Sequence, residues 1–354
     1  MGKRRRDADG RRIVQVTDLF AGCGGAAQGL KSALFSRGFF AEFRAYEQNK
    51  EALDVYHRNH PVVGGHLGDI RKVRDDEIQP ADILWASPEC TNHTRASGKA
   101  EHARCDVSRD LAFQLFRWVD RAEPRLILVE NVAEFASSWR RFDEWLREFS
   151  RRGFRVEWRV LDALCYGAHT RRVRFYAQAG RHRISWPEPL SQVHAPATDI
   201  IDPEEKARSI FRKGYSIAPS SVRKICGGIR KFYLETGQLE LAEGWETLDK
   251  PPRVVRAPSD FRKQFLIKFY GTATALPLSK PLGTITTVSK FNLVELERQG
   301  AHLDIRRRML SVNELALAQG LDCYDWNGSR VRAINRMLGN SVCPDVARAP
   351  GECY

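Results

Sequence analysis

The chain has 354 residues, of which 42% are hydrophobic and 29% charged, as in ordinary soluble globular proteins. Its net charge of +13 favours a polyanionic partner, with nucleic acid the first choice and an anionic membrane surface the second. Its eight cysteines form no Cys-x-x-Cys pair, which argues against zinc and a disulfide framework, so we expect free thiols, no metal and a reducing compartment. Because no apolar run approaches membrane-spanning length, we expect no membrane association.

Strand-like and helix-like segments alternate through the first half of the chain. Strands are predicted over residues 13–16, 43–46, 83–86 and 126–129, and helices over residues 26–35 and 50–58. This alternation predicts an α/β domain with a mostly parallel sheet over residues 13–180. The polar, basic residues 1–12 are expected to form a disordered tail.

The sequence changes character after residue 180. Prolines interrupt long helices there, and basic residues alternate with aromatic ones, as in Phe211-Arg212-Lys213-Gly214-Tyr215. We expect a second, smaller domain over residues 181–285, which on this pattern alone is simply an irregular basic domain. A helix over 310–320 and a turn followed by a helix over 334–349 lie in the segment 286–354, which we expect to return to the first domain.

The first predicted strand runs into a glycine-rich turn. The strand ends in Asp18-Leu19-Phe20, and Gly22-Cys23-Gly24-Gly25 opens the next helix. Glycines remove the Cβ atoms that would collide with a bound ligand. A dinucleotide site fits less well, because Ala27 stands at the third position of the Gly-x-Gly-x-x-Gly pattern. The turn alone is equally consistent with a nucleotide site and with a structural turn.

Two acidic residues follow at further strand ends. Glu47 comes after the second strand and could accept hydrogen bonds from ribose hydroxyls, and Asp69 could accept one from an adenine amino group. Surface acids are common, so neither residue is a specific signal alone.

Three more segments carry reactive or charged groups. Cys90 follows the strand 83–86 in Ser87-Pro88-Glu89-Cys90, where it could be a nucleophile at a sheet edge or a small buried apolar residue. Glu130 follows the strand 126–129 and could act as an acid or cap a helix. Arg172 and Arg174 alternate along a strand and therefore share one face, which is either a functional face or a solvated one.

Taken together in chain order, these motifs resemble the cytosine-C5 methyltransferase family over nearly all of residues 13–349. Asn340, in Gly339-Asn340-Ser341-Val342, matches the last family motif. The resemblance implies a Rossmann-like sheet that binds S-adenosylmethionine and a target-recognition domain at 181–285. It assigns cofactor contacts to the residues that match the family: Asp18, Phe20, Gly22, Gly24, Glu47, Asp69 and Asn340.

The resemblance also implies the chemistry. Cys90 would add to C6 of a cytosine flipped out of double-stranded DNA, Glu130 would act near N3, and Arg172 with Arg174 would hold O2. C5 would then accept the methyl group. We expect a monomeric enzyme that needs no metal and associates with DNA in a bacterial or phage-like cytoplasm, as restriction–modification enzymes do.

The chain departs from the family beside the nucleophile. Where Pro-Pro-Cys-Gln is usual it has Pro88-Glu89-Cys90-Thr91, and a neighbouring carboxylate opposes thiolate formation unless Arg95 or Lys99 neutralises it. His169-Thr170 likewise replaces Pro-Gln. Three alternatives remain: a transfer-RNA cytosine methyltransferase, a catalytically silent DNA-binding relative, and a nicotinamide dehydrogenase. The last does not explain the cysteine, the acid and the arginines together.

Overall fold

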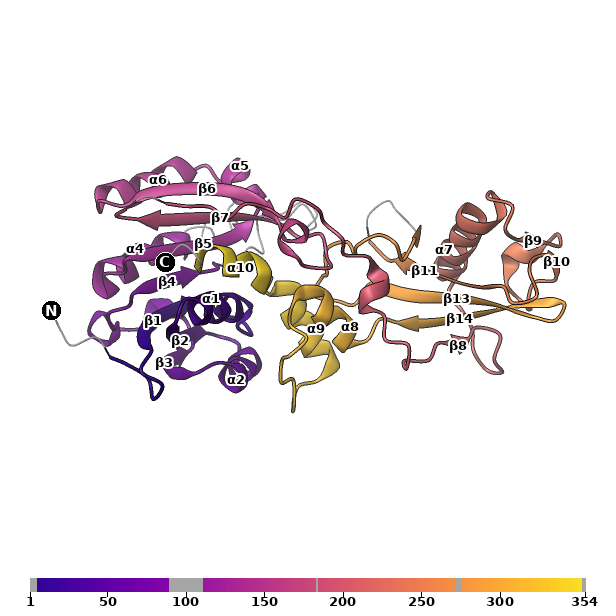
Figure 1. The fold of residues 1–354 in the computed structure, drawn as a ribbon, viewed down its shortest axis with the longest axis horizontal. Helices are drawn as coiled ribbons and strands as arrows, with labels where there is room; N and C mark the ends of the chain where they lie inside the picture. Colours follow the sequence, from indigo (N-terminus) through magenta and orange to yellow (C-terminus); the bar gives the residue numbers. More distant parts are fainter. Residues whose placement is uncertain (1–4, 89–110, 183, 271–274, 352–354) are drawn as a thin grey trace.

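The computed structural model describes residues 5–88, 111–182, 184–270 and 275–351. The molecule is elongated, with one lobe at each end and helices α8 (Val312–Gln319) and α9 (Val331–Asn340) between them (Figure 1). Each lobe is built on its own sheet. None of the helices in the described ranges combines the length and the apolar character needed to cross a membrane.

The first lobe contains a seven-stranded sheet in the order β3-β2-β1-β4-β5-β7-β6. Strands β1 to β5 run parallel, whereas β7 is antiparallel to both of its neighbours. The predicted α/β class and mostly parallel sheet are confirmed. The strands are β1 (Arg12–Leu19), β2 (Phe39–Glu47), β3 (Val62–Leu67), β4 (Ile83–Ala86), β5 (Leu126–Val132), β6 (Arg155–Asp162) and β7 (Val173–Gly180).

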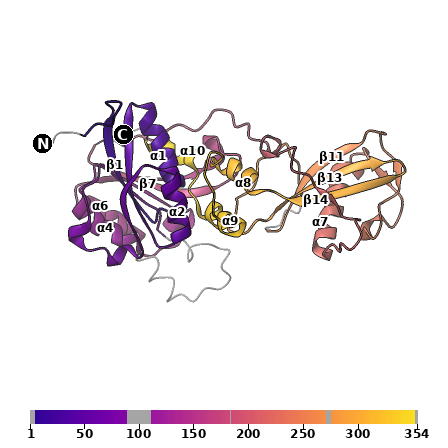
Figure 2. The ribbon, with the colours of Figure 1, turned by 90° about the horizontal axis from the view of Figure 1, so that it is seen from below.

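Helices cover both faces of this sheet (Figures 1 and 2). In β4, Leu84 packs into one core and Trp85 into the other, because successive side chains of a strand point to opposite faces. Burial on both faces explains why the central strands are continuous apolar runs. The helices of the two layers are α4 (Leu111–Ala122), α5 (Glu134–Ser138) and α6 (Phe142–Arg151) on one face, and α1 (Gly25–Ser36), α2 (Lys50–Asn59) and α10 (Pro344–Gly351) on the other.

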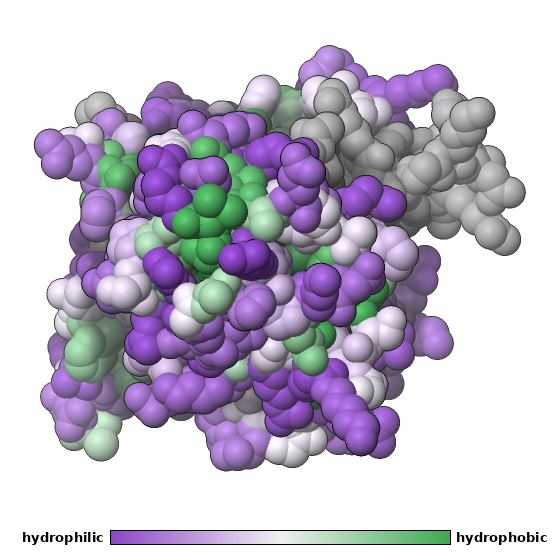
Figure 3. All heavy atoms as spheres, turned by 90° about the vertical axis from the view of Figure 1, so that its right-hand side faces the viewer, coloured by the Kyte–Doolittle hydropathy of each residue, from purple (hydrophilic) through white to green (hydrophobic). Residues whose placement is uncertain are grey.

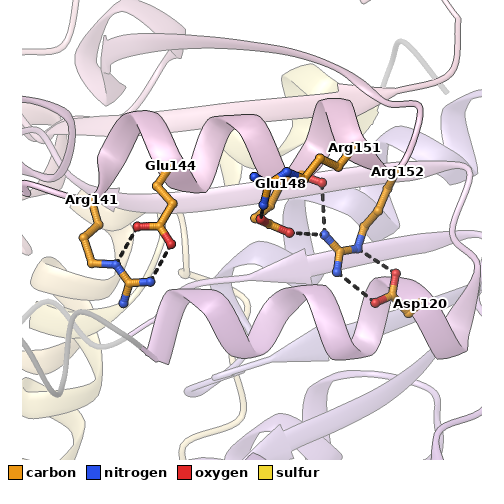
Figure 4. A network of polar contacts seen from close by, with 6 residues as sticks. All are labelled: Asp120, Arg141, Glu144, Glu148, Arg151 and Arg152. Carbon is orange, nitrogen blue, oxygen red and sulfur yellow. Dashed lines mark hydrogen bonds and ion pairs between the residues drawn. The ribbon is translucent and has the colours of Figure 1, made fainter.

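A polar network lies on the outer surface of α4 and α6 (Figure 4). Arg152, at the end of α6, donates to Asp120 of α4 at 2.6 Å and to Glu148 at 2.5 Å. Arg141 and Glu144 form a second pair on α6 at 2.6 Å. Exposed pairs of this kind contribute little to the free energy of unfolding, so the buried aromatic core beneath these helices carries most of their stability.

The second lobe contains an antiparallel sheet in the order β12-β11-β13-β14-β8, with its own apolar core. Its two long strands β13 and β14 lie beyond residue 285, where we expected the second domain to end, so the sheet continues to Met309. The elements are β8 (Arg208–Ser209), α7 (Pro219–Ile229), β9 (Glu240–Leu241), β10 (Val254–Arg256), β11 (Arg262–Lys268), β12 (Ala275–Leu276), β13 (Phe291–Gln299) and β14 (His302–Met309).

Short helical turns join these elements. They are η1 (Ile70–Lys72), η2 (Asp75–Glu77), η3 (Ala163–Tyr166), η4 (Ala197–Ile200) and η6 (Trp245–Thr247), with a π-helical turn η5 (Arg230–Leu234) after α7.

Two expectations about the ends of the chain were wrong. Residues 5–12 were expected to be disordered, but they fold back on β1, with Arg6 bridged to Arg12 and Arg5 paired with Glu42 at 3.0 Å. The segment from residue 334 was expected to begin with a turn, yet α9 covers it as far as Asn340. Its buried residues Ile334, Met337 and Leu338 recur at helical spacing, and this spacing explains the helix.

Candidate active site

A cavity of about 700 Å³ opens at the carboxyl ends of the parallel strands. One part is lined by the turn after β1, the end of β2 and the segment around Asp69. The other part is lined by Ser87 and Pro88 after β4, the end of β5, and the start of β7. Residues 336–342 of α9 and the following turn border it too. Of the predicted site residues these parts bring together Asp18, Phe20, Gly22, Glu47, Asp69, Glu130, Arg172, Arg174 and Asn340.

Other parts of the chain pack closely against two glycines of the glycine-rich turn, which the sequence pattern did not indicate. Phe20 and Gly24 both adopt positive φ, at 58° and 95°. A Cβ atom at Gly24 would lie 2.4 Å from Nε2 of His60, and one at Gly25 would lie 2.1 Å from Oγ of Ser341. These two glycines therefore make room for other parts of the chain, whereas Gly22 has open space around it and faces the cavity.

Glu47 ties the end of β2 to this turn. Its Oε2 accepts a hydrogen bond from the Gly22 amide at 2.9 Å, and its Oε1 accepts one from the Asn49 amide at 2.8 Å. Each carboxylate oxygen has a further lone pair available, so the residue can still accept from a ligand hydroxyl.

Asp69 and Asp18 lie in contrasting electrostatic surroundings. Hydrogen bonds from the Arg71 guanidinium lower the pKa of Asp69 to about 2, so this carboxylate stays charged. Asp18 is 1% exposed, and burial raises its pKa to about 7. Tyr56 donates to its Oδ2 at 3.1 Å, while Oδ1 has no hydrogen-bond partner in the part of the chain that the structure describes.

Glu130 and Asn131 belong to β5 itself rather than following it. Burial raises the pKa of Glu130, although Arg174, whose Nε lies 3.5 Å from Oε1, opposes this shift. Asn131 donates to the carbonyl of Pro88 at 3.2 Å and so connects β5 to the segment that leads to Cys90. Cys90 and its neighbour Glu89 lie outside the described residues.

The two arginines enter the same part of the cavity from the start of β7. Arg172 is 3% exposed, and its Nη2 donates to the carbonyl of Gly339 at 3.1 Å. Its Nε and Nη1 have no hydrogen-bond partner within the described ranges. Burial, together with the like charge of Arg174, lowers the pKa of Arg172. The arrangement places two guanidinium groups beside one buried carboxyl.

Sequence reasoning missed several residues of this cavity. Asn131 and Ser341 stood next to predicted residues, but only the packing of β5 and of the turn after α9 reveals their contacts. Arg336 had no motif to mark it. Among the described residues, no group of three or more His, Cys, Asp and Glu side chains could hold a metal ion.

A family model described as C-5 cytosine-specific DNA methylase matches residues 14–352. With this match and this sheet, the chain belongs to the C-5 cytosine-specific DNA methylase family.

Individual relatives agree with that membership. The Type II methyltransferase M.AplI of Arthrospira platensis is 28% identical over 347 residues, covering 97% of this chain and 86% of that protein. M.AgeI of Thalassovita gelatinovora is 26% identical over 219 residues, 58% of this chain and 48% of the relative. The chain matches about half the length of several such curated relatives.

Two solved structures have the same fold. The S. pombe Dnmt2 methyltransferase superposes with a TM-score of 0.60 at 16% identity, covering 96% of both chains. The Entamoeba histolytica methyltransferase EhMeth gives 0.59 at 17% identity, covering 96% of this chain and 97% of that one.

Proposed function

We propose that this chain transfers a methyl group from S-adenosylmethionine to C5 of cytosine in double-stranded DNA. The observation that carries the proposal is the cavity, because it joins a glycine-rich turn and two carboxylates to a buried acid and two arginines. The family to which the chain belongs supports the same assignment.

The residues of the first part of the cavity fit the cofactor. Gly22 leaves open space at the turn, and Glu47 and Asp69 offer acceptors for ribose hydroxyls and an adenine amino group. Phe20 and Asn340 also line this part, whereas Gly24 lies in the same turn without lining the cavity, and Asp18 has one buried oxygen with no partner among the described residues. S-adenosylmethionine supplies an electrophilic methyl group when it is bound.

The residues of the second part fit a cytosine ring. C5 of cytosine is a poor nucleophile, so we propose that the Cys90 thiolate forms a bond to C6 and makes C5 an enamine carbon. Glu130, with its raised pKa, donates a proton or a hydrogen bond to N3 as charge develops there. Arg172 and Arg174 hold O2. After C5 has gained the methyl group it loses its proton to a base, and the C6–S bond breaks to release the thiolate.

The second lobe is proposed to hold the DNA and choose the target sequence. A base inside a duplex cannot reach the cavity, so the cytosine must flip out of the helix. Figure 3 looks onto the end of this lobe and shows hydrophilic side chains around a smaller apolar patch. Together with the net charge of +13, this surface suits phosphate contacts around a region that reads bases.

A covalent trap tests the proposal. Duplex DNA that carries 5-fluorocytosine should form a stable adduct in the presence of S-adenosylmethionine, because fluorine replaces the proton that must leave. Cys90→Ala should abolish the adduct, whereas Cys165→Ala, a free cysteine outside the cavity, should retain it. An adduct of equal yield with Cys90→Ala would overturn the mechanism, and transfer to tRNA but not to duplex DNA would overturn the substrate.

The setting of the enzyme is part of the proposal. Relatives named as Type II methyltransferases support a role in a restriction–modification system within the bacterial or phage-infected cytoplasm. We also propose that the chain acts as a monomer and without a metal. Light scattering of the purified protein should give the mass of a single chain, and methyl transfer should continue in the presence of EDTA.

A further inference from the structure

A buried histidine and tyrosine outside the cavity contact the glycine-rich turn from behind. His60 follows α2, and Tyr324 lies in the segment between α8 and α9, 264 residues later. They are 5% and 8% exposed. The hydroxyl of Tyr324 lies 2.8 Å from Nε2 of His60 and 2.7 Å from the carbonyl oxygen of Gly24.

The hydrogen bonds have one consistent direction. A carbonyl only accepts, so Tyr324 donates its single proton to Gly24 and must accept from His60. Nε2 of His60 therefore carries the proton and the ring is neutral, which agrees with a pKa that burial lowers to about 3. The chain of donors runs from His60 through Tyr324 to the turn.

The segment that carries Tyr324 is anchored to the end of α2. Asn59 donates from Nδ2 to the carbonyl of Asp325 at 3.2 Å, and its Oδ1 accepts from the Asp325 amide at 2.8 Å. Paired bonds of this kind fix a backbone segment as a strand neighbour would. His60 is the next residue after Asn59. The position of the Tyr324 hydroxyl is therefore fixed both by its hydrogen bond with His60 and by the bonds of Asn59 to the neighbouring Asp325 backbone.

We propose that His60 and Tyr324 are positioning residues for the cofactor: they hold the carbonyl of Gly24, and through it the conformation of the turn that lines the cofactor part of the cavity. Gly24 precedes α1 with φ at 95°; its amide donates to the Ala21 carbonyl at 3.1 Å and its carbonyl accepts from the Gln28 amide at 2.9 Å, so Tyr324 adds a second hydrogen bond to that carbonyl. A peptide unit is planar, so fixing the carbonyl of Gly24 also fixes the amide plane of Gly25, which lines the cavity. From the other side the Glu47 carboxylate holds Gly22. The inference rests on the proposed use of this cavity for S-adenosylmethionine.

Removal of one hydroxyl tests the proposal. Tyr324→Phe keeps the ring and its contact with His60 but removes one of the two hydrogen bonds that the Gly24 carbonyl accepts, leaving the bond from the Gln28 amide. We expect calorimetry to show S-adenosylhomocysteine binding weakened about fivefold, which is the effect of one hydrogen bond. KM for S-adenosylmethionine should rise in proportion, with kcat and DNA affinity nearly unchanged.

The second lobe offers a matched control. Tyr233 is 7% exposed, and its hydroxyl also donates to a backbone carbonyl, that of Gln264 at 3.0 Å. Tyr233→Phe should lower the unfolding temperature about as much as Tyr324→Phe but leave cofactor affinity unchanged. Asn59→Ala provides a second route, because it loosens the anchor at Asp325 without altering the aromatic residues, and it should also weaken cofactor binding.

The outcomes separate this inference from the proposed function. If the wild-type chain does not bind S-adenosylhomocysteine, the proposed function fails and this inference fails with it. If wild type binds while Tyr324→Phe and Asn59→Ala, shown to be folded, bind equally well, only the positioning role is overturned. An equal loss of affinity in Tyr233→Phe would also overturn it, because the effect would then be one of general stability.

Discussion

The carboxyl groups beside the cavity of the first lobe and those on the sheet of the second lobe lie in contrasting surroundings. In the first lobe, Glu130 and Asp18 are buried at strand ends beside the cavity, and burial raises the pKa of each. In the second lobe, Glu297 on β13 lies between Arg262 at 2.5 Å and Arg306 at 2.9 Å, on a partly exposed sheet face.

This difference separates the carboxyl groups that we propose to act in binding and catalysis from those that stabilise a sheet. A carboxyl with a raised pKa and an incomplete set of partners can exchange a proton or accept a new ligand near neutral pH. A carboxylate held between two arginines on adjacent strands has its partners already and mainly keeps the sheet soluble and in register.

The largest expected effect is that of Glu130→Gln. The amide keeps the shape but cannot donate a proton to N3, so kcat should fall by about a hundredfold or more. The measurement is single-turnover methyl transfer to duplex DNA, with S-adenosylhomocysteine affinity as the check on folding. Glu297→Gln is the control and should stay within about twofold. Comparable losses in both variants would break the distinction between the lobes.

The Arg308–Glu314 pair at the end of β14 differs from the exposed pairs of the second lobe because it is largely buried. Glu314 is 2% exposed and receives both Nη groups of Arg308 at 2.7 Å, and it also accepts from the Asp202 amide at 2.9 Å. Glu314 therefore connects the two segments that link the lobes: the segment around Asp202 and the segment that follows β14.

Glu314→Ala removes the carboxylate partner of the largely buried Arg308 guanidinium, which keeps only the carbonyl oxygens of Met309 and Asp202. We expect it to lower the free energy of unfolding by about 3–5 kcal/mol in urea denaturation. The double variant Arg308→Met with Glu314→Leu should recover most of this loss, because an apolar pair removes the uncompensated charge. A single-variant loss below about 1 kcal/mol would show that the junction is not a buried ion pair in solution.

Asp18 should make stability depend on pH. Its folded pKa of about 7 lies above the ordinary value of 3.8, so the folded state binds the proton more tightly than the unfolded state. The stabilising contribution of this group is present below about pH 4 and is lost as pH rises to about 7, a change of roughly 2–4 kcal/mol.

Asp18→Asn removes this titration. Relative to wild type, the variant should therefore gain stability as pH rises from 4 to 7, which urea denaturation at several pH values measures. Parallel profiles for the two proteins would mean that Asp18 is charged throughout.

The smallest expected effect is that of Arg262→Ala in the second lobe. The arginine side chain is 78% exposed, and Glu297 keeps its second partner, Arg306. The free energy of unfolding should change by about 0.5 kcal/mol or less. If the free energy of unfolding fell by more than about 2 kcal/mol, the Arg262–Glu297 pair would behave as a buried ion pair like Arg308–Glu314.

Much of the first lobe could be predicted from the sequence. The strands at 83–86 and 126–129 are buried on both faces, so each is an apolar run that stands out locally. Strand β6 was not predicted, because it is an edge strand whose charged residues alternate with partly or fully exposed apolar ones, so no apolar run marks it. The extension of the second sheet past residue 285 was missed for a similar reason: Glu295, Glu297 and Arg306 interrupt the apolar pattern of its long strands.

The sequence by itself determined which residues meet at the candidate site. Asp18, Glu47 and Glu130 lie near the carboxyl ends of parallel strands, which converge, and the paired arginines lie at the start of the antiparallel strand β7, at the same edge of the sheet. Only the tertiary structure decided how those residues are held. The bonds of Tyr324 to Gly24 and of Arg172 to Gly339 join segments 300 and 167 residues apart, and no local pattern encodes such pairs. Burial, which raises the pKa of Asp18 and Glu130, likewise exists only once the chain has packed.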